Sequence, residues 1–366
     1  KSNNIKFLFL SIILSIVMEN AKFFCNMVKQ GYNKGACEVY LKNDSKQPAC
    51  QATLKFENGQ YHRVITAMHL SRPEDYFSIY QSGCNHNCLK CHSWEFSKYF
   101  NGKWYSTDEI ADACKNYENR ITVMEPRERA LMYYANDLCK HCGSCILFNK
   151  RSPLCPKKVT RDKIVLGPQG FGPARNIVAF TGGDIACQAE FYVEITKKIK
   201  QKCKNLWVLL ESNGYGLTPK NLDLFQKAGL DSYWLDIKAY DEKIYRKLCG
   251  THNKTVLNSV NEIYKRNFVL EILTVYIPNL VELDQFEKIA QLIAETDKNI
   301  PFHILAFFPQ YKLKKFRSPN LDEILETFNA VKRIGLKKIQ IGNVGVFAKK
   351  EDEIKKLIHT VGPNAF

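Results

Sequence analysis

The sequence predicts an α/β fold built around a partial or full parallel (β/α) barrel. From residue 77 onward, short apolar strand-like runs alternate with amphipathic helical segments in about six successive units. Such alternation is typical of a parallel sheet whose strands are joined by crossover helices. At 366 residues and 45% hydrophobic side chains, the chain can bury one large core. A doubly wound sheet is the alternative that this periodicity leaves open.

The individual elements follow one another along the chain. Strands are expected at residues 77–82, 176–182, 206–212, 232–237, 269–277, 302–307 and 338–342, where β-branched and aromatic residues gather. Helices are expected from about residue 106 and over residues 187–203, 218–228, 241–248, 254–266, 282–296 and 320–334. In a parallel barrel the carboxyl ends of these strands share one edge, where functional residues gather.

The chain divides into four predicted parts. Residues 7–17 form an apolar run too short to span a bilayer, so residues 1–17 are expected to be a non-native or signal-like segment. Residues 18–75 are expected to form a small β-rich cap with a hairpin turn at residues 57–60. Residues 76–345 are expected to form the barrel, with an aperiodic metal-binding insertion at about 138–175, and residues 346–366 a C-terminal tail.

Composition narrows the functional classes. Fourteen cysteines in tight clusters and scattered singles indicate metal binding rather than a disulfide scaffold, in a reducing, cytoplasmic and anaerobic setting. The 53 basic side chains exceed the 37 acidic ones, but they are spread along the chain. This spread favours a lysine-rich solvated surface over a nucleic-acid-binding face, and no membrane partner is expected.

Cys84, Cys88 and Cys91 share one loop directly after the first barrel strand. Three thiolates on a short loop suit an iron–sulfur cluster. Because a four-iron cubane needs four ligands, three cysteines leave one iron open, and an open iron can chelate amino and carboxylate groups. The alternative is a zinc site completed by His86 or His92.

The C-x3-C-x2-C spacing resembles the signature of the radical S-adenosylmethionine (SAM) superfamily. Within it, the chain resembles pyruvate formate-lyase activating enzymes and AmmeMemoRadiSam-type archaeal proteins. The resemblance implies a [4Fe–4S] cluster that binds and reduces SAM, with the three cysteines as catalytic ligands. It also implies SAM-binding residues at later strand ends: Gly182, Gly183 and Asp184, which resemble a Gly-Gly-Glu element, then Ser212 and Asn213, and finally Asp236 and Lys238.

A second cysteine set lies in the insertion. Cys139, Cys142, Cys145 and Cys155 resemble a ferredoxin half-motif and predict either a second [4Fe–4S] cluster or a mononuclear iron or zinc ion. The remaining cysteines lack such spacing and are expected to be inert buried thiols. They are Cys25, Cys37, Cys50, Cys114, Cys187, Cys203 and Cys249.

The resemblance implies an enzyme that cleaves SAM reductively to a 5′-deoxyadenosyl radical, which abstracts hydrogen from a protein or peptide. The expected partners are that substrate and a low-potential electron donor such as ferredoxin or flavodoxin. Two alternatives stay open: radical modification of a small molecule, including methylation, and a non-catalytic metal-binding module for nucleic acid. The strand-end motifs favour an enzyme, because a nucleic-acid module would not need them.

Overall fold

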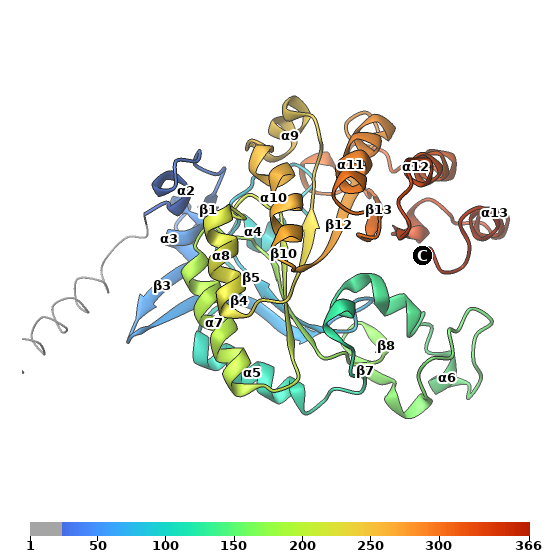
Figure 1. Ribbon diagram of the computed structural model, residues 1–366, viewed down its shortest axis with the longest axis horizontal. Helices are drawn as coiled ribbons and strands as arrows, with labels where there is room; N and C mark the ends of the chain where they lie inside the picture. The colour runs from blue at the N-terminus through green and yellow to red at the C-terminus, as the bar shows by residue number, and fades with distance from the viewer. Residues whose placement is uncertain (1–23) are drawn as a thin grey trace, which may run out of the picture.

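The computed structural model describes residues 24–366, and the segment predicted at residues 1–17 lies outside them. A ten-stranded sheet forms the centre of the molecule (Figure 1). Its strands run in the order β14-β13-β12-β11-β10-β9-β5-β4-β3, and β6 pairs with β4. Their bounds are β3 (Leu54–Glu57), β4 (Gln60–Leu70), β5 (Phe77–Gln81), β6 (Lys103–Ser106), β9 (Ile177–Gly182), β10 (Trp207–Ser212), β11 (Ser232–Asp236), β12 (Val269–Tyr276), β13 (Phe302–Ala306) and β14 (Ile339–Gly342).

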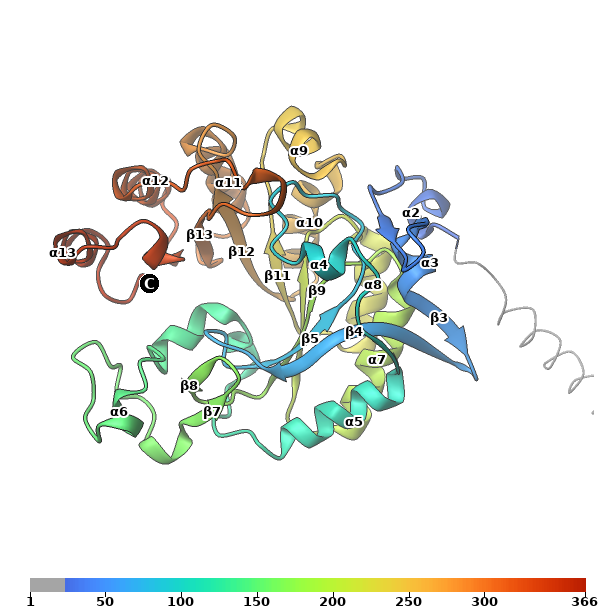
Figure 2. The same cartoon turned by 180° about the vertical axis from the view of Figure 1, so that it is seen from behind.

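Strands β5 and β9 to β14 form a parallel series, and each strand pairs with the next member of this series. Crossovers of one hand between successive neighbours place the connecting helices on one face and curve the sheet into a barrel. Consecutive helices accordingly pack on one another outside the sheet (Figure 2). They are α5 (Thr107–Glu118), α7 (Ala189–Lys202), α8 (Pro219–Ala228), α10 (Lys254–Lys265), α11 (Leu283–Thr296), α12 (Leu321–Ile334) and α13 (Glu351–Val361), while the short α9 (Glu242–Cys249) precedes α10.

The predicted parallel α/β barrel is confirmed, and it is a partial one. Across residues 24–366, no ladder joins β14 to the strands at the opposite end of the sheet. The strands and helices expected from residue 77 onward are present near their predicted bounds. The segment expected as a tail contains α13, which packs on α12. No helix in the described part of the chain is long and apolar enough to cross a membrane.

The β-rich segment before the barrel joins the same sheet. Strands β3 and β4 form a hairpin whose turn residues, Asn58 and Gly59, have φ values of 52° and 76°. Two positive φ angles define the mirror-image turn that matches the twist of paired strands. Strand β4 then pairs antiparallel with β5. Before them lie α2 (Asn26–Lys29), β1 (Glu38–Tyr40), β2 (Lys46–Pro48) and α3 (Ala49–Thr53). The division into a cap and a barrel stays a prediction.

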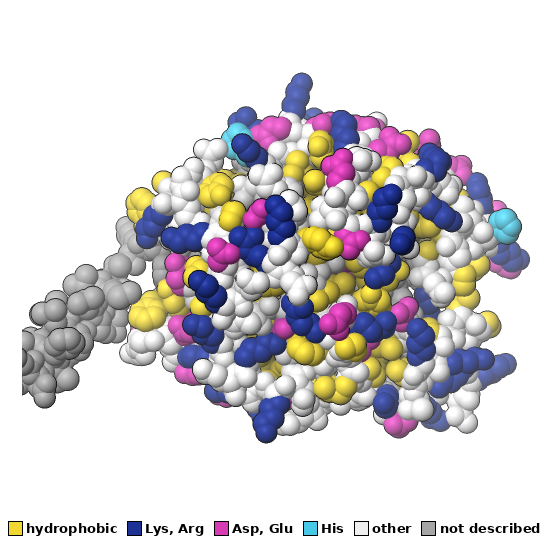
Figure 3. Space-filling view, in the orientation of Figure 1, with side chains coloured by type: hydrophobic (Ala, Val, Ile, Leu, Met, Phe, Trp, Pro, Cys, Tyr) yellow, Lys and Arg dark blue, Asp and Glu magenta, His cyan; other side chains and the backbone are white. Residues whose placement is uncertain are grey.

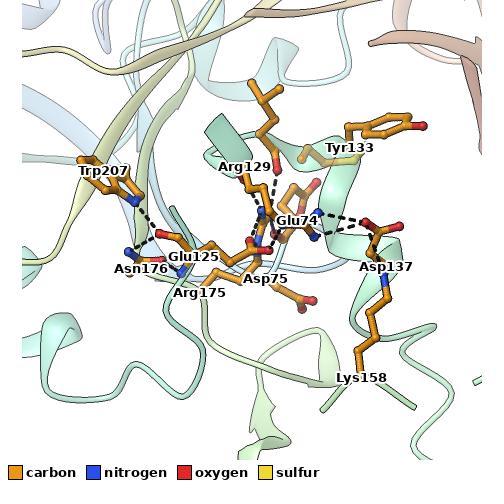
Figure 4. Close-up of polar contacts among 12 residues, drawn as sticks. Glu74, Asp75, Glu125, Arg129, Tyr133, Asp137, Lys158, Arg175, Asn176 and Trp207 are labelled. Carbon is orange, nitrogen blue, oxygen red and sulfur yellow. Dashed lines mark hydrogen bonds and ion pairs between the residues drawn. The ribbon is translucent and has the colours of Figure 1, made fainter. Parts of the chain in front are cut away.

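A buried ion-pair network fixes the segment between α5 and β9 (Figure 4). Arg175 is fully buried and pairs with Glu125, which also binds Arg129 at 2.7 Å. The Arg175 guanidinium donates to the carbonyls of Leu131 and Arg129 at 2.8 and 2.6 Å. Trp207 of β10 donates its indole N–H to the Glu125 carbonyl at 2.8 Å. These bonds tie the chain that enters the insertion to the barrel.

The insertion consists of short elements: α6 (Ser144–Leu147), a 3₁₀ turn (Arg161–Lys163), and the two-stranded pair β7 (Val165–Gly167) and β8 (Gly170–Gly172). Arg72 and Asp75, which precede β5, hold it. Arg72 donates to the Gly172 carbonyl at 2.9 Å, and Asp75 binds His141 at 2.9 Å. The insertion is therefore attached at the amino end of β5.

Candidate active site

The cysteine loop lies at the opposite, carboxyl end of β5. The β5–β9 register pairs Gln81 with Gly182, so the chain leaving β5 meets the chain leaving β9. The Asn85 amide donates to the Asp184 carbonyl at 2.8 Å, and the Asn87 amide donates to the Cys249 carbonyl at 2.9 Å. The loop with Cys84, Cys88 and Cys91 is thus held between the end of β9 and the end of α9.

The three thiols lie in a buried environment that contains cationic side chains. Burial raises the pKa of the Cys84 thiol to about 11, and the Lys98 ammonium opposes this shift. A hydrogen bond with Cys249 and the charge of Lys238 lower the pKa of Cys88. The Cys91 Sγ lies 3.1 Å from the Ser97 Oγ. Nearby ammonium groups favour thiolates, the form that ligates metals.

The zinc alternative does not fit the histidines of this loop. His86 is buried, and its Nδ1 lies 2.9 Å from Asn85 Oδ1 while its Nε2 lies 2.9 Å from the Tyr245 hydroxyl. Both ring nitrogens are therefore engaged. The His92 ring instead packs edge-on against Phe308. Three cysteines on one loop fit a cluster in which each thiolate binds a different iron.

Gly182 and Gly183 let the β9 end approach this loop. A Cβ on Gly183 would lie 2.2 Å from the Gly83 carbonyl oxygen, so no other residue fits there without moving the loop. Gly182 has a φ of 85°, a left-handed conformation that glycine adopts without strain. The two glycines therefore bring backbone groups within reach of whatever binds above the cysteines.

The Asp184 carboxylate joins the chain segments that follow β9 and β10. Its Oδ1 accepts from the Ala186 amide at 2.7 Å, and its Oδ2 accepts from the Ser212 hydroxyl at 2.7 Å and the Asn213 amide at 2.9 Å. The carboxylate is buried. Burial raises its pKa, while these three donors oppose the shift. Both oxygens are thus already used to hold the β9 and β10 ends together.

Asn213 connects this junction to the first cysteine. Its Nδ2 donates to Asn85 Oδ1 at 2.6 Å and lies 3.7 Å from the Cys84 Sγ. Ser212, which ends β10, points its hydroxyl at Asp184. The two residues predicted at this strand end therefore lie beside the cysteine loop.

Asp236 ends β11, Lys238 follows the strand, and the two side chains form an ion pair. Burial opposes ionisation of Lys238, but the charges of Asp236 and Cys88 raise the pKa of Lys238 above its ordinary value. The second carboxylate oxygen, Asp236 Oδ1, is buried and has no hydrogen-bond partner in the described part of the chain. Buried acceptors are normally satisfied, so this atom is available to a ligand donor.

The comparisons with known proteins decide the family. A family model for the radical SAM superfamily matches residues 136–293. The chain is 32% identical over 236 residues to a Methanocaldococcus jannaschii protein named as a glycyl-radical enzyme activating enzyme. The aligned region covers 62% of this chain and 84% of that protein. The chain belongs to the radical SAM superfamily. Membership implies a [4Fe–4S] cluster and SAM as cofactors.

A further relative and one solved structure are also similar to this chain. The radical SAM chain is 25% identical over 190 residues to the pyruvate formate-lyase-activating enzyme of Clostridium pasteurianum, which covers 50% of this chain and 73% of that enzyme. A solved domain of a pyruvate-formate lyase-activating enzyme from Bacteroides vulgatus superposes with a TM-score of 0.39 at 18% identity, covering 45% of this chain and 98% of the domain.

The insertion cysteines lie apart from this radical SAM loop. Cys142 is exposed, while Cys139, Cys145 and Cys155 are half-buried. The His141 amide points at the Cys139 Sγ at 3.3 Å. The insertion is attached before β5 and the radical SAM loop follows that five-residue strand, so the attachment point and the loop lie at opposite ends of a strand roughly 15 Å long.

Sequence reasoning missed one residue that builds the site. Arg63 of β4 is fully buried and donates to the carbonyls of Gly83 and Gly183, both at 3.3 Å. Arg63 therefore holds the start of the cysteine loop and the end of β9 together. No local signal marks it, because an arginine in a strand usually points to solvent.

Proposed function

We propose that this radical SAM protein is an activating enzyme that abstracts hydrogen from a protein or peptide. The single observation that supports it most is the meeting of the strand-end loops after β5, β9, β10 and β11 around three thiols. When bound, the [4Fe–4S] cluster supplies one electron to the SAM sulfonium, which releases methionine and yields the hydrogen-abstracting radical. The names of the relatives favour a protein substrate.

In this proposal, each residue of the chain has a limited role. Cys84, Cys88 and Cys91 ligate three irons. Gly182 and Gly183 present backbone groups to the SAM amino acid moiety, which the absence of side chains permits. Asp236 Oδ1, which has no partner within the described residues, accepts a hydrogen bond from SAM, and Lys238 holds Asp236 ionised.

Two predicted ligands act indirectly in this proposal. Asp184 and Ser212 bind each other rather than a ligand, so they position the loops that contact SAM. Asn213 holds Asn85 and thereby the backbone next to Cys84. This assignment separates residues whose loss removes a SAM contact from residues whose loss loosens the site.

A low-potential electron donor completes the proposal. The chain has a formal charge of +16, which suits an acidic donor such as ferredoxin or flavodoxin, because opposite charge steers association. On the face shown in Figure 3, Lys and Arg side chains are interspersed with Asp and Glu. This mixed surface does not resemble the clustered basic face of a nucleic-acid-binding module.

The chemistry is tested by anaerobic reconstitution with iron and sulfide, followed by incubation with SAM and dithionite. We expect 5′-deoxyadenosine and methionine in equal amounts. Cys84→Ala should abolish both products, whereas Cys114→Ala, which removes a buried thiol of α5 away from the site, should retain them. Equal product from the Cys84 variant would refute the assignment.

The substrate class is tested with extract of the native source grown in D₂O. The extract is divided into a dialysed macromolecular fraction and a small-molecule filtrate, and each is added to the reaction. We expect deuterium in 5′-deoxyadenosine with the macromolecular fraction, and its loss after protease treatment. Deuterium transfer from the filtrate alone would instead assign a small-molecule substrate.

A further inference from the structure

Four cysteines that share no sequence motif line a single cavity. The cavity has a volume of about 270 Å³ and lies between the N-terminal segment and the chain following β9 and β10. Its lining includes Cys25, Cys37, Cys50 and Cys187. Cys50 and Cys187 are each 8% exposed, and Cys25 and Cys37 are half-buried. This convergence differs from the expectation that these thiols are inert and unrelated.

Each cysteine comes from a different element. Cys25 precedes α2, Cys37 precedes β1, Cys50 lies in the first turn of α3, and Cys187 precedes α7. Their thiols are close enough for the charge of each to influence others, since Cys25, Cys37 and Cys50 all act on Cys187. The fold therefore brings together four soft ligands that are far apart in the sequence. Cys25 and Cys187 are 162 residues apart, as are their neighbours Asn26 and Gln188, whose side chains form a hydrogen bond.

A second observation concerns the charge beside the cavity. Arg63 is fully buried, and no carboxylate in residues 24–366 forms an ion pair with it. The groups whose charge acts on it include Asp184 and the thiols of Cys84 and Cys50. An unpaired buried cation is costly. Its Nε has no hydrogen-bond partner among the described residues. Arg63 is therefore a buried positive charge within electrostatic range of Cys84 in the radical SAM loop and of Cys50 in the cavity wall, and anionic clusters at these cysteines would neutralise it.

The remaining lining suits an inorganic cluster better than a polar metabolite. Met27, Ile185 and Tyr215 make much of the wall apolar, and Lys34 adds a second cation. Apolar surroundings and nearby positive charge tune the potential of a thiolate-bound cluster. A single zinc ion at 2.3 Å from each sulfur would need the thiols to converge on one point. A cubane instead sets each thiolate on a separate iron, so its four sulfurs span a wider space.

We propose that Cys25, Cys37, Cys50 and Cys187 bind an auxiliary [4Fe–4S] cluster. Four thiolates ligate all four irons, so this cluster has no open iron for SAM and carries electrons or stabilises the fold. Binding releases the protons of the four thiols. Asn85 lines the cavity and directly follows Cys84, so the cluster lies next to the radical SAM loop. By contrast, the insertion cysteines lie at the other end of β5.

The proposal is tested by iron content and thiol protection in the anaerobically reconstituted full chain. We expect Cys25→Ala with Cys37→Ala to lower bound iron by about four atoms per chain, the content of one cubane. The matched control, Cys114→Ala with Cys203→Ala, removes two buried thiols that do not line the cavity and should leave iron unchanged. Equal iron in both variants would overturn the proposal, as would loss of one zinc ion instead of iron.

A labelling experiment on the unsubstituted protein keeps the proposal testable if the cavity variant does not fold. In reconstituted protein, Cys25 and Cys37 should resist iodoacetamide although both are half-exposed. After iron is removed with a chelator, both should alkylate, as peptide mass analysis would show. Alkylation to the same extent before and after iron removal would contradict cluster binding. Because the readouts are iron and labelling at these positions, failure of SAM cleavage would not affect them.

Discussion

Replacing Asp184 tests whether a predicted SAM ligand in fact supports the site. Asp184→Ala removes three hydrogen bonds from a buried carboxylate, at 2.7, 2.7 and 2.9 Å. A hydrogen bond to a charged group contributes about 1.5–3 kcal/mol, and neighbouring bonds are not additive. We therefore expect the free energy of unfolding to fall by about 4 kcal/mol. The affinity for SAM should fall with it, because the β9 and β10 ends lose their connection.

Two milder variants calibrate this expectation. Ser212→Ala removes one of the three donors and should cost about 1.5 kcal/mol. Asp184→Asn keeps the acceptor for Ala186, but its amide group would face the Asn213 N–H, so its effect should lie between the other two.

The assay combines denaturant unfolding with equilibrium dialysis of SAM under anaerobic conditions. If Asp184 positions the loops, stability and SAM affinity should decline in the same order across the three variants. The reasoning would be refuted by an Asp184→Ala protein with an unchanged unfolding midpoint and lost SAM affinity. That result would make the carboxylate a direct ligand.

Three further predictions concern the barrel and the insertion. Arg175→Met should lower the free energy of unfolding by about 3–5 kcal/mol, measured by denaturant titration, because Glu125 loses its buried partner, and an unchanged midpoint would contradict this. Burial raises the pKa of Glu211 to about 8, above its value in the unfolded chain, so the free energy of unfolding should fall as pH rises toward 8. Glu211→Gln should flatten this pH dependence, as thermal melts at several pH values would show. If the four insertion cysteines bind a metal that relays electrons, replacing them with Ser should slow turnover with a flavodoxin donor but spare dithionite-driven SAM cleavage. If they bind a structural metal, the replacement should lower thermal stability and leave turnover unchanged.

The sequence predicted the barrel elements well because their signals are local. Residues 206–212 and 269–277 are mostly apolar, and they form β10 and β12. Helix starts are also local, since Ser106 and Asn320 form capping boxes with the residues three positions later. The sequence could not show whether the barrel closes, because closure depends on whether the first and last strands meet. The hairpin of β3 and β4 occupies the edge beside β5 instead.

At the candidate site, the sequence predicted which loops matter but not what each side chain does. Strand-end motifs placed Asp184, Ser212 and Asp236 at one edge, and the structure brings their loops together. It also shows that Asp184 accepts from three donors of its own chain, while one oxygen of Asp236 has no hydrogen-bond partner among residues 24–366. Hydrogen-bond partners of a buried carboxylate are chosen by packing, which a tripeptide motif does not contain.

By itself, the sequence determined the alternating strands and helices, the three-cysteine loop and the resemblance to the radical SAM superfamily. Each rests on residues a few positions apart, whose spacing directly sets periodicity or ligation. Only the tertiary structure decided that Arg63 is buried against the cysteine loop with no carboxylate partner among residues 24–366, and that Cys25, Cys37, Cys50 and Cys187 line one cavity. Such groupings arise where separate elements pack against one another, so the distances that define them exist only in the folded chain.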